Sequence, residues 1–206
     1  MAHRIELGIP RRLPRPAPLE GVVEHRQDLA VTAAGDLGGG LLGLLRRTGL
    51  LLVRQSRGRA WIPACLWMGL IWFMSSLSSP LGRDPRPSLA FFGNLAHPFE
   101  YGVLTLLLLP TAQRFQGWIQ FDRESLGGRI ALILSYAAID EFHQSFVLGR
   151  HSSPLDWLAD ATGMYCTLKV AAYISEPEAT SAGVGKRCLY GVFLCCLAAG
   201  FTFLDV

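Results

Sequence analysis

Charged residues are scarce in this chain. Asp, Glu, Lys and Arg make up 17% of its 206 residues, and half of all residues are hydrophobic, whereas a soluble domain has about 25% charged residues. The mean hydropathy is positive, at +0.31. This composition disfavours a water-soluble globular fold and predicts an integral membrane protein.

Other signatures are also missing from the sequence. The five cysteines form no C-x-x-C pair, so the sequence indicates neither a zinc-binding motif nor a disulfide framework. The segment "LGGGLLG" lacks the lysine of a phosphate-binding loop, and no Ser-His-Asp order is present. The first sixty residues contain no apolar signal-peptide core, so we expect the first membrane crossing to act as an uncleaved targeting signal.

What the sequence does contain is a series of long apolar segments. Each one, with its flanks, reaches the ~20 residues that a helix needs to cross a bilayer. The sequence therefore predicts an all-α, polytopic membrane bundle of about five transmembrane helices. The predicted crossings are Trp61 to Leu77, Leu89 to Ala112, Arg129 to Phe146, Pro154 to Tyr173 and Cys188 to Leu204.

The distribution of basic residues predicts the orientation, because Lys and Arg near crossings favour the cytoplasmic side. Ten basic residues fall on one side of the predicted bundle and three on the other. The ten are Arg46, Arg47, Arg54, Arg57, Arg59, Arg114, Arg123, Arg129, Lys186 and Arg187; the three are Arg83, Arg86 and Arg150. We therefore expect a bacterial inner-membrane protein with its amino terminus in the cytoplasm and its carboxyl terminus outside.

The same pattern divides the chain into three parts. Residues 1–58 form a basic arm rich in Pro and Arg, which we expect to be largely disordered apart from an interfacial amphipathic segment at Leu37 to Val53. Residues 59–175 form a four-helix membrane domain, and residues 176–206 form a linker and the fifth helix. The arm's basic charge is explained by orientation and by contact with anionic lipid, so no nucleic-acid partner is expected.

The third predicted crossing ends in an unusual run, "IDEFHQSFVLGR". It follows "RIALILSYAA" without a turn signal, so Asp140, Glu141, His143 and Gln144 should lie on one continuous helix. If that helix enters the membrane at Arg129, Asp140 lies ~16 Å along it, in the outer half of the bilayer. Charged side chains at such a depth must face the bundle interior or a wet cavity.

Two other crossings place polar residues at the same depth. In "NLAHPFEYGVL", the side chains of His97, Glu100 and Tyr101 share a helix face, and in "SSPLDWLADATG", Asp156 and Asp160 recur four residues apart. Ser153 is a suitable N-cap, and Pro154 a suitable first residue, for the helix that carries Asp156 and Asp160. We expect the three helices to converge on one polar site. Its candidate catalytic residues are His97, Glu100, Asp140, Glu141 and His143; its candidate ligand-binding residues are Tyr101, Gln144, Arg150, Asp156 and Asp160.

Three blocks, "HPFEY", "DEFHQSFVLGR" and "DWLADATG", together with the preceding "SSLSSP", resemble the VanZ-like family of membrane proteins. The resemblance covers roughly Trp61 to Tyr173 and departs from the family pattern at Leu148, where many members have Pro before Gly-Arg. It implies a cell-envelope role linked to resistance to the glycopeptide antibiotic teicoplanin. It does not imply a reaction or a cofactor, and it names no protein partner.

Several functions are compatible with these residues. A recognition or catalytic pocket for a lipid-linked or peptidyl precursor would use a histidine as acid or base and Arg150 to pair with an anionic group. A metal-dependent version would require His97, Glu100, His143 and a carboxylate of the third helix to converge on Zn or Mn. The same residues could instead relay protons or ions, or could serve only as hydrogen bonds that hold helices together.

Overall fold

The structure is a computed structural model that describes residues 40–78, 87–115, 118–150 and 152–201. In this part of the chain it is helical except for one short antiparallel pair, in which Arg114 pairs with Ile119 and Phe115 with Trp118. The elements in chain order are α2 (Gly40–Arg54), α3 (Arg57–Ser76), α4 (Pro87–Leu108), the 3-10 helix η2 (Leu109–Thr111), β1 (Arg114–Phe115), β2 (Trp118–Ile119), α5 (Arg123–Gln144), α6 (Pro154–Ile174) and α7 (Ser181–Phe201).

Local sequence signals set several helix starts. The side chains of Ser56, Asp122 and Ser153 accept hydrogen bonds from backbone N–H groups in the first turns of α3, α5 and α6. Each cap satisfies a backbone donor that has no partner within the helix. Pro154 follows Ser153 as the first residue of α6, a position at which its missing N–H costs no helical hydrogen bond.

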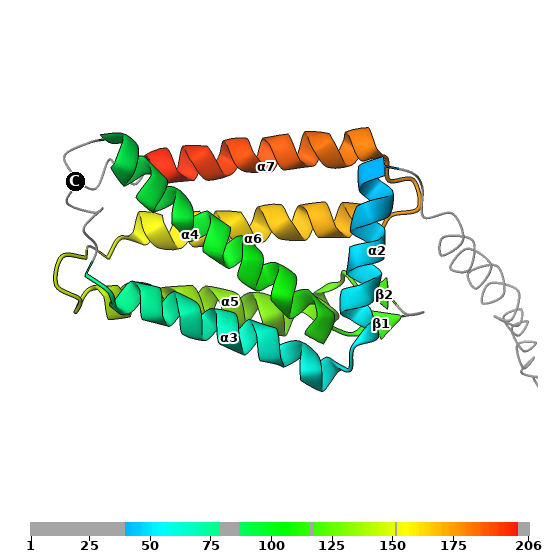
Figure 1. The fold of residues 1–206 in the computed structure, drawn as a ribbon, viewed down its shortest axis with the longest axis horizontal. Coiled ribbons are helices and arrows are strands. Elements are labelled where there is room, and N and C mark those ends of the chain that lie inside the picture. Colours follow the sequence, from blue (N-terminus) through cyan, green and yellow to red (C-terminus); the bar gives the residue numbers. More distant parts are fainter. Residues whose placement is uncertain (1–39, 79–86, 116–117, 151, 202–206) are drawn as a thin grey trace, which may run out of the picture. The chain divides into compact units, whose positions relative to one another are not determined.

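The helices form a bundle in which α3, α5, α6 and α7 run along a common direction and α4 crosses them obliquely (Figure 1). The helix α4 packs mainly on α6, and α6 also contacts α5 and α7. Long side chains tie neighbouring helices to backbone carbonyls: Trp67 donates to Glu100 O, Tyr136 to Met68 O and Trp157 to Leu134 O. These bonds fix how α3, α4, α5 and α6 are placed relative to one another.

The crossing of α4 and α6 depends on glycine. A Cβ at Gly163 would collide with the backbone of Pro98, and a Cβ at Gly102 would lie 3.0 Å from Oγ1 of Thr167. Small residues at a helix interface allow two backbones to approach closely. The two glycines therefore bring the middle of α4 onto the first half of α6.

The helix α2 lies across one end of the bundle, beside the β1–β2 pair (Figure 1). Arg46 donates to the carbonyl oxygens of Ile174 and Glu176, just at and beyond the end of α6. Arg114 donates to the carbonyls of Gln55 and Pro110 at the same end. Basic side chains thus satisfy carbonyl groups that helix ends leave without partners.

Three of the five predicted crossings coincide with helices to within a few residues, whereas the third and fifth begin six or more residues earlier than predicted. The third helix starts at Arg123 because Asp122 caps it, and the fifth starts at Ser181. Asp140, Glu141, His143 and Gln144 lie on one continuous helix, as predicted. The sequence did not predict the two short strands. Residues 1–39 of the basic arm lie outside the described residues.

Among the described helices, α7 alone is long and apolar enough to count as a membrane span by length and composition. The helices α5 and α6 carry the acidic residues of "IDEFHQ" and "LDWLAD", which lower their average hydropathy. The all-helical class is therefore confirmed, while the number of membrane crossings remains a prediction.

Candidate functional site

The buried carboxyl groups lie, with Ser75, near the end of the bundle opposite α2. Ser75 lies at the carboxyl end of α3, Asp140 and Glu141 lie in the last turn of α5, and Asp160 lies in the second turn of α6. All four are buried. The apolar core occupies the adjoining part of the bundle and includes Ile71, Leu104, Leu108 and Ile133.

Three of the predicted site residues meet at the α4–α6 crossing. Nδ1 of His97 lies 3.2 Å from Oδ1 of Asp160 and 3.8 Å from Oε1 of Glu141. Asp160 is fully buried, and His97 and Glu141 retain only slight exposure. We call His97, Glu141 and Asp160 the triad. It unites one side chain from each of α4, α5 and α6, and the close contact of Pro98 with Gly163 holds His97 within reach of Asp160.

Backbone and amide donors orient the Glu141 carboxylate. The backbone N–H of Ser153 donates to Oε2 at 3.2 Å, and Nε2 of Gln144 lies 3.5 Å from Oε1. Ser153 is also the cap of α6, so the start of that helix and the glutamate are fixed together. A carboxylate held in this way can act as a ligand or base without reorganising.

Asp140 points to a different set of partners. Its Oδ2 atom accepts hydrogen bonds from Ser75 Oγ at 2.8 Å and Gln144 Nε2 at 3.0 Å. Gln144 therefore links Asp140 to Glu141 and so links the two parts of the polar site. Sequence reasoning missed Ser75, although two adjacent serines at the end of an otherwise apolar helix were a signal that could have found it.

Tyr101 is the largest fully buried side chain, and its hydroxyl has no hydrogen-bond partner among the described residues. Its ring lies near that of Tyr136, with centroids 6.2 Å apart. Tyr101 follows His97 by four residues on α4, so the two side chains share a face of that helix. Tyr101 was predicted as a ligand-binding residue, and the structure brings it to the site.

Glu100 and Asp156 border the triad. Asp156 precedes Asp160 by four residues on α6, and Glu100 follows His97 by three residues on α4, so each shares a helix face with a residue of the triad. Both side chains are half-buried. Both carboxyl groups therefore lie close to His97 and Asp160 along their helices.

His143 and Arg150 were predicted as site residues, but they do not join the triad. His143 stacks on Trp72, with ring centroids 4.1 Å apart, and its Nε2 atom lies 3.0 Å from Ser76 Oγ. It follows Glu141 by two residues on a helix, so it points to another face. Arg150 donates to the carbonyls of Leu77 and Met74, where it closes the end of α3.

An open pocket of about 330 Å³ adjoins Glu141 at the junction of α5 and α6. Its wall is mainly apolar, and Ser152 and Ser153 add polar groups. The lining residues are Ala138, Glu141, Phe142, Ser152, Ser153, Pro154 and Trp157. The volume lies at the lower end of the range for small-molecule sites, which is roughly 300 to 1,000 Å³. Glu141 therefore lies between the other two residues of the triad and the open pocket on the surface of the bundle.

A model of the VanZ/LLP1 family matches residues 60–174. Searches among curated proteins and among solved structures found no significant match. The family match takes in α3, α4, α5 and α6 and every residue of the triad. Because it covers more than half of the 206 residues, the chain belongs to the VanZ/LLP1 family.

Proposed function

We propose that this protein is a five-span inner-membrane protein that binds, and acts on, the polar group of a lipid-linked or peptidyl cell-envelope precursor. The triad and the adjoining pocket form the binding site, in the outer half of the bilayer. The observation that carries the proposal is the meeting of His97, Glu141 and Asp160, from three different helices, next to an open pocket.

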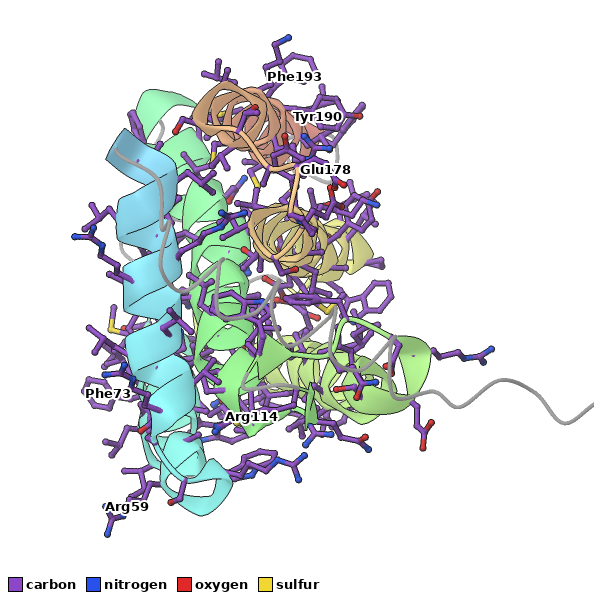
Figure 2. All side chains as sticks on the ribbon, turned by 90° about the vertical axis from the view of Figure 1, so that its right-hand side faces the viewer. Arg59, Phe73, Arg114, Glu178, Tyr190 and Phe193 are labelled. Carbon is purple, nitrogen blue, oxygen red and sulfur yellow. The ribbon has the colours of Figure 1, made fainter. Side chains whose placement is uncertain are left out.

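The distribution of side chains supports a membrane environment. Large apolar side chains are exposed on α3 and α7, among them Leu66 at 71%, Phe73 at 59% and Leu189 at 74%. Figure 2 shows Phe73 and Phe193 projecting away from the bundle. Carboxylates are buried while leucine and phenylalanine face outward, the reverse of a soluble protein and the arrangement expected in lipid.

The helix α2 fits the interfacial role expected for that segment. Leu42 and Val53 are buried against the bundle, while Leu41, Leu44, Leu51 and Leu52 are exposed. Their spacing puts the exposed leucines on one helix face. We infer that α2 lies along the membrane surface with this face in the lipid and the exposed Arg47 and Arg54 at the headgroups.

The positions of the helix ends support the proposed orientation. The α2 end of the bundle holds the basic residues from Arg46 to Arg59, those around β1 and the start of α5, and Lys186 and Arg187. The triad lies toward the other end, since Asp160 is six residues, or ~9 Å, from the start of α6. With the basic end in the cytoplasm, the site faces the side where cell-envelope precursors are processed.

The triad is chemically suited to proton transfer. His97 can accept or donate a proton while Asp160 holds its ring, and Glu141 carries a second titratable group to the pocket wall. The apolar pocket wall can accommodate the non-polar part of a lipid-linked molecule. The link to teicoplanin resistance rests on family membership and forms part of the proposal.

Paired variants test this function in a bacterial host that expresses the protein and is challenged with teicoplanin. We expect Glu141→Gln and His97→Asn to abolish any protection while membrane insertion stays intact. The matched controls are Glu124→Gln, in the first turn of α5, and His143→Asn, outside the triad, and both should retain protection. A wild-type protein without protective effect would contradict the antibiotic link.

The same variants separate a working site from structural hydrogen bonding. If the triad only holds helices together, Glu141→Gln and His97→Asn should lower thermal stability in detergent, and protection should follow the folded fraction. If the site is functional, protection should disappear in protein of near wild-type stability, because removing a buried charge also removes its desolvation cost. Native mass spectrometry should detect a co-purifying precursor on the wild type and less of it on Glu141→Gln.

A further inference from the structure

We propose that the triad is the binding site of a divalent transition-metal ion of the Zn²⁺ or Mn²⁺ kind. The ligands are Nδ1 of His97, a carboxylate oxygen of Glu141 and a carboxylate oxygen of Asp160. The inference rests on the proposed function and deepens it, because it uses the same side chains; a bound ion would take the place of the hydrogen bond between His97 Nδ1 and Asp160. It is tested by metal content, which does not depend on whether the protein acts on a cell-envelope precursor.

The distances within the triad fit one shared ion. Two ligands bound at ~2.1 Å from the same ion lie roughly 3.0 to 3.4 Å apart in octahedral or tetrahedral geometry. His97 Nδ1 and Asp160 Oδ1 are 3.2 Å apart, and the ligand atoms of all three residues lie within 4.8 Å of one another. Oε1 of Glu141 lies 3.8 Å from Nδ1 of His97, a few tenths of an ångström beyond that range.

Unpaired buried oxygens provide a second, independent indication. Asp160 is fully buried, and its Oδ2 atom has no hydrogen-bond partner among the described residues. Oδ1 of Asp140 and the hydroxyl of Tyr101 are buried and unpaired in the same region. Buried oxygens without partners cost free energy, and a cation in the triad gives Asp160 a partner and lowers the cost of the neighbouring negative charge.

The balance of charge also favours a cation. Glu141 and Asp160 lie within the triad, and Gln144 links Asp140 to Glu141. Asp156 and Glu100 share helix faces with Asp160 and His97. The nearby Arg150 bonds to backbone carbonyls at the end of α3. Several carboxyl groups around one imidazole in a low-dielectric interior can be ionised together only if a cation or a metal ion compensates their charge.

The donor types select the class of ion. An imidazole nitrogen with two carboxylate oxygens suits Zn, Mn or Fe, whereas Mg and Ca prefer oxygen ligands alone. Three protein ligands leave coordination positions open, as in catalytic metal sites. These proposed ligands differ from the metal ligands expected from the sequence, because Asp160 is among them and Glu100 and His143 are not.

Metal analysis of the detergent-purified full-length protein tests the proposal. Protein stripped with a chelator is incubated with Zn²⁺ or with Mn²⁺, dialysed, and assayed for bound metal. We expect one ion per wild-type chain and an affinity at least tenfold weaker in His97→Asn and Asp160→Asn. His143→Asn and Glu124→Gln, both outside the triad, should bind as the wild type does. Mn²⁺ also controls for the five cysteines, because soft thiolates favour zinc over manganese.

A measurement on the wild type covers the case in which a triad variant fails to fold. Mn²⁺ bound to the unaltered protein should show magnetic coupling to one imidazole nitrogen by electron paramagnetic resonance, and Zn²⁺ should displace it. Absence of stoichiometric metal, equal binding by folded triad variants, or binding without nitrogen coupling would overturn the metal site. Metal binding by a protein that neither protects nor retains a precursor would instead refute only the proposed function.

Discussion

The carbonyl of Pro98 in α4 lies against Gly163 in α6 so closely that a single added methyl group would collide with it. This contact is one residue from His97 and three residues from Asp160, whose side chains lie 3.2 Å apart. The geometry of the site therefore depends on a position that has no side chain. Glycine at this crossing matters for close approach rather than for backbone freedom.

Replacing Gly163 by alanine should separate α4 from α6 and weaken the His97–Asp160 contact. Overpacking a close contact costs about 1 to 3 kcal/mol, so the melting temperature in detergent should fall and site-dependent protection should be lost. Gly69→Ala is the matched control, because nothing lies within 4 Å of a Cβ at that position in α3. Equal melting temperatures for the two variants would show that α4 and α6 are less tightly packed than described.

Sequence patterns predicted much of this arrangement. The recurrence of Asp156, Asp160 and Gly163 on one face of α6, and the run from Asp140 to Gln144, directed attention to the helices that meet at the triad. Helical periodicity shows which residues share a helix face. Where that face is polar within an apolar segment, it must pack against other helices and not against lipid.

The partners within the site could not be predicted from the sequence. Adjacent residues of α5 make different contacts: Asp140 bonds to Ser75, Glu141 lies by His97, and His143 stacks on Trp72. Which neighbour each residue meets depends on the rotation and crossing angle of whole helices. Those are set by packing across the interface, and a single sequence gives only the spacing along each helix.

Ser75→Ala should test how much the Asp140 network contributes to stability. The change removes the 2.8 Å hydrogen bond to Asp140 Oδ2 and leaves Gln144 as a donor. Interhelical hydrogen bonds in membrane proteins are worth ~0.6 kcal/mol on average, so we expect a small loss of thermal stability. Thr48→Ala is a suitable control because Thr48 bonds only to its own helix in the contacts described. A larger loss from the control would contradict this role of Ser75.

The proposed topology predicts which loops a membrane-impermeant thiol reagent can reach. In a variant whose five cysteines are replaced by serine, Ser152→Cys should be labelled in intact cells, and Gln120→Cys only after the membrane is permeabilised. Both positions are exposed in the structure. The opposite labelling pattern would place the triad in the cytoplasmic half of the membrane and would contradict a role on outward-facing precursors.

Arg46 should hold α2 against the end of the bundle. Its guanidinium donates to the carbonyl of Ile174, the last residue of α6, at 3.1 Å and to Glu176 O just beyond the helix at 2.8 Å. Arg46→Ala should therefore increase hydrogen exchange in α2 and around Ile174, while exchange at the triad stays unchanged because that site lies toward the opposite end. Arg47→Ala is the matched control, since Arg47 is exposed on the neighbouring position of the same helix. If the amides of α2 exchange at the same rate in both variants, the contact of Arg46 does not hold the helix in place. The exposed leucine face in the lipid would then hold it.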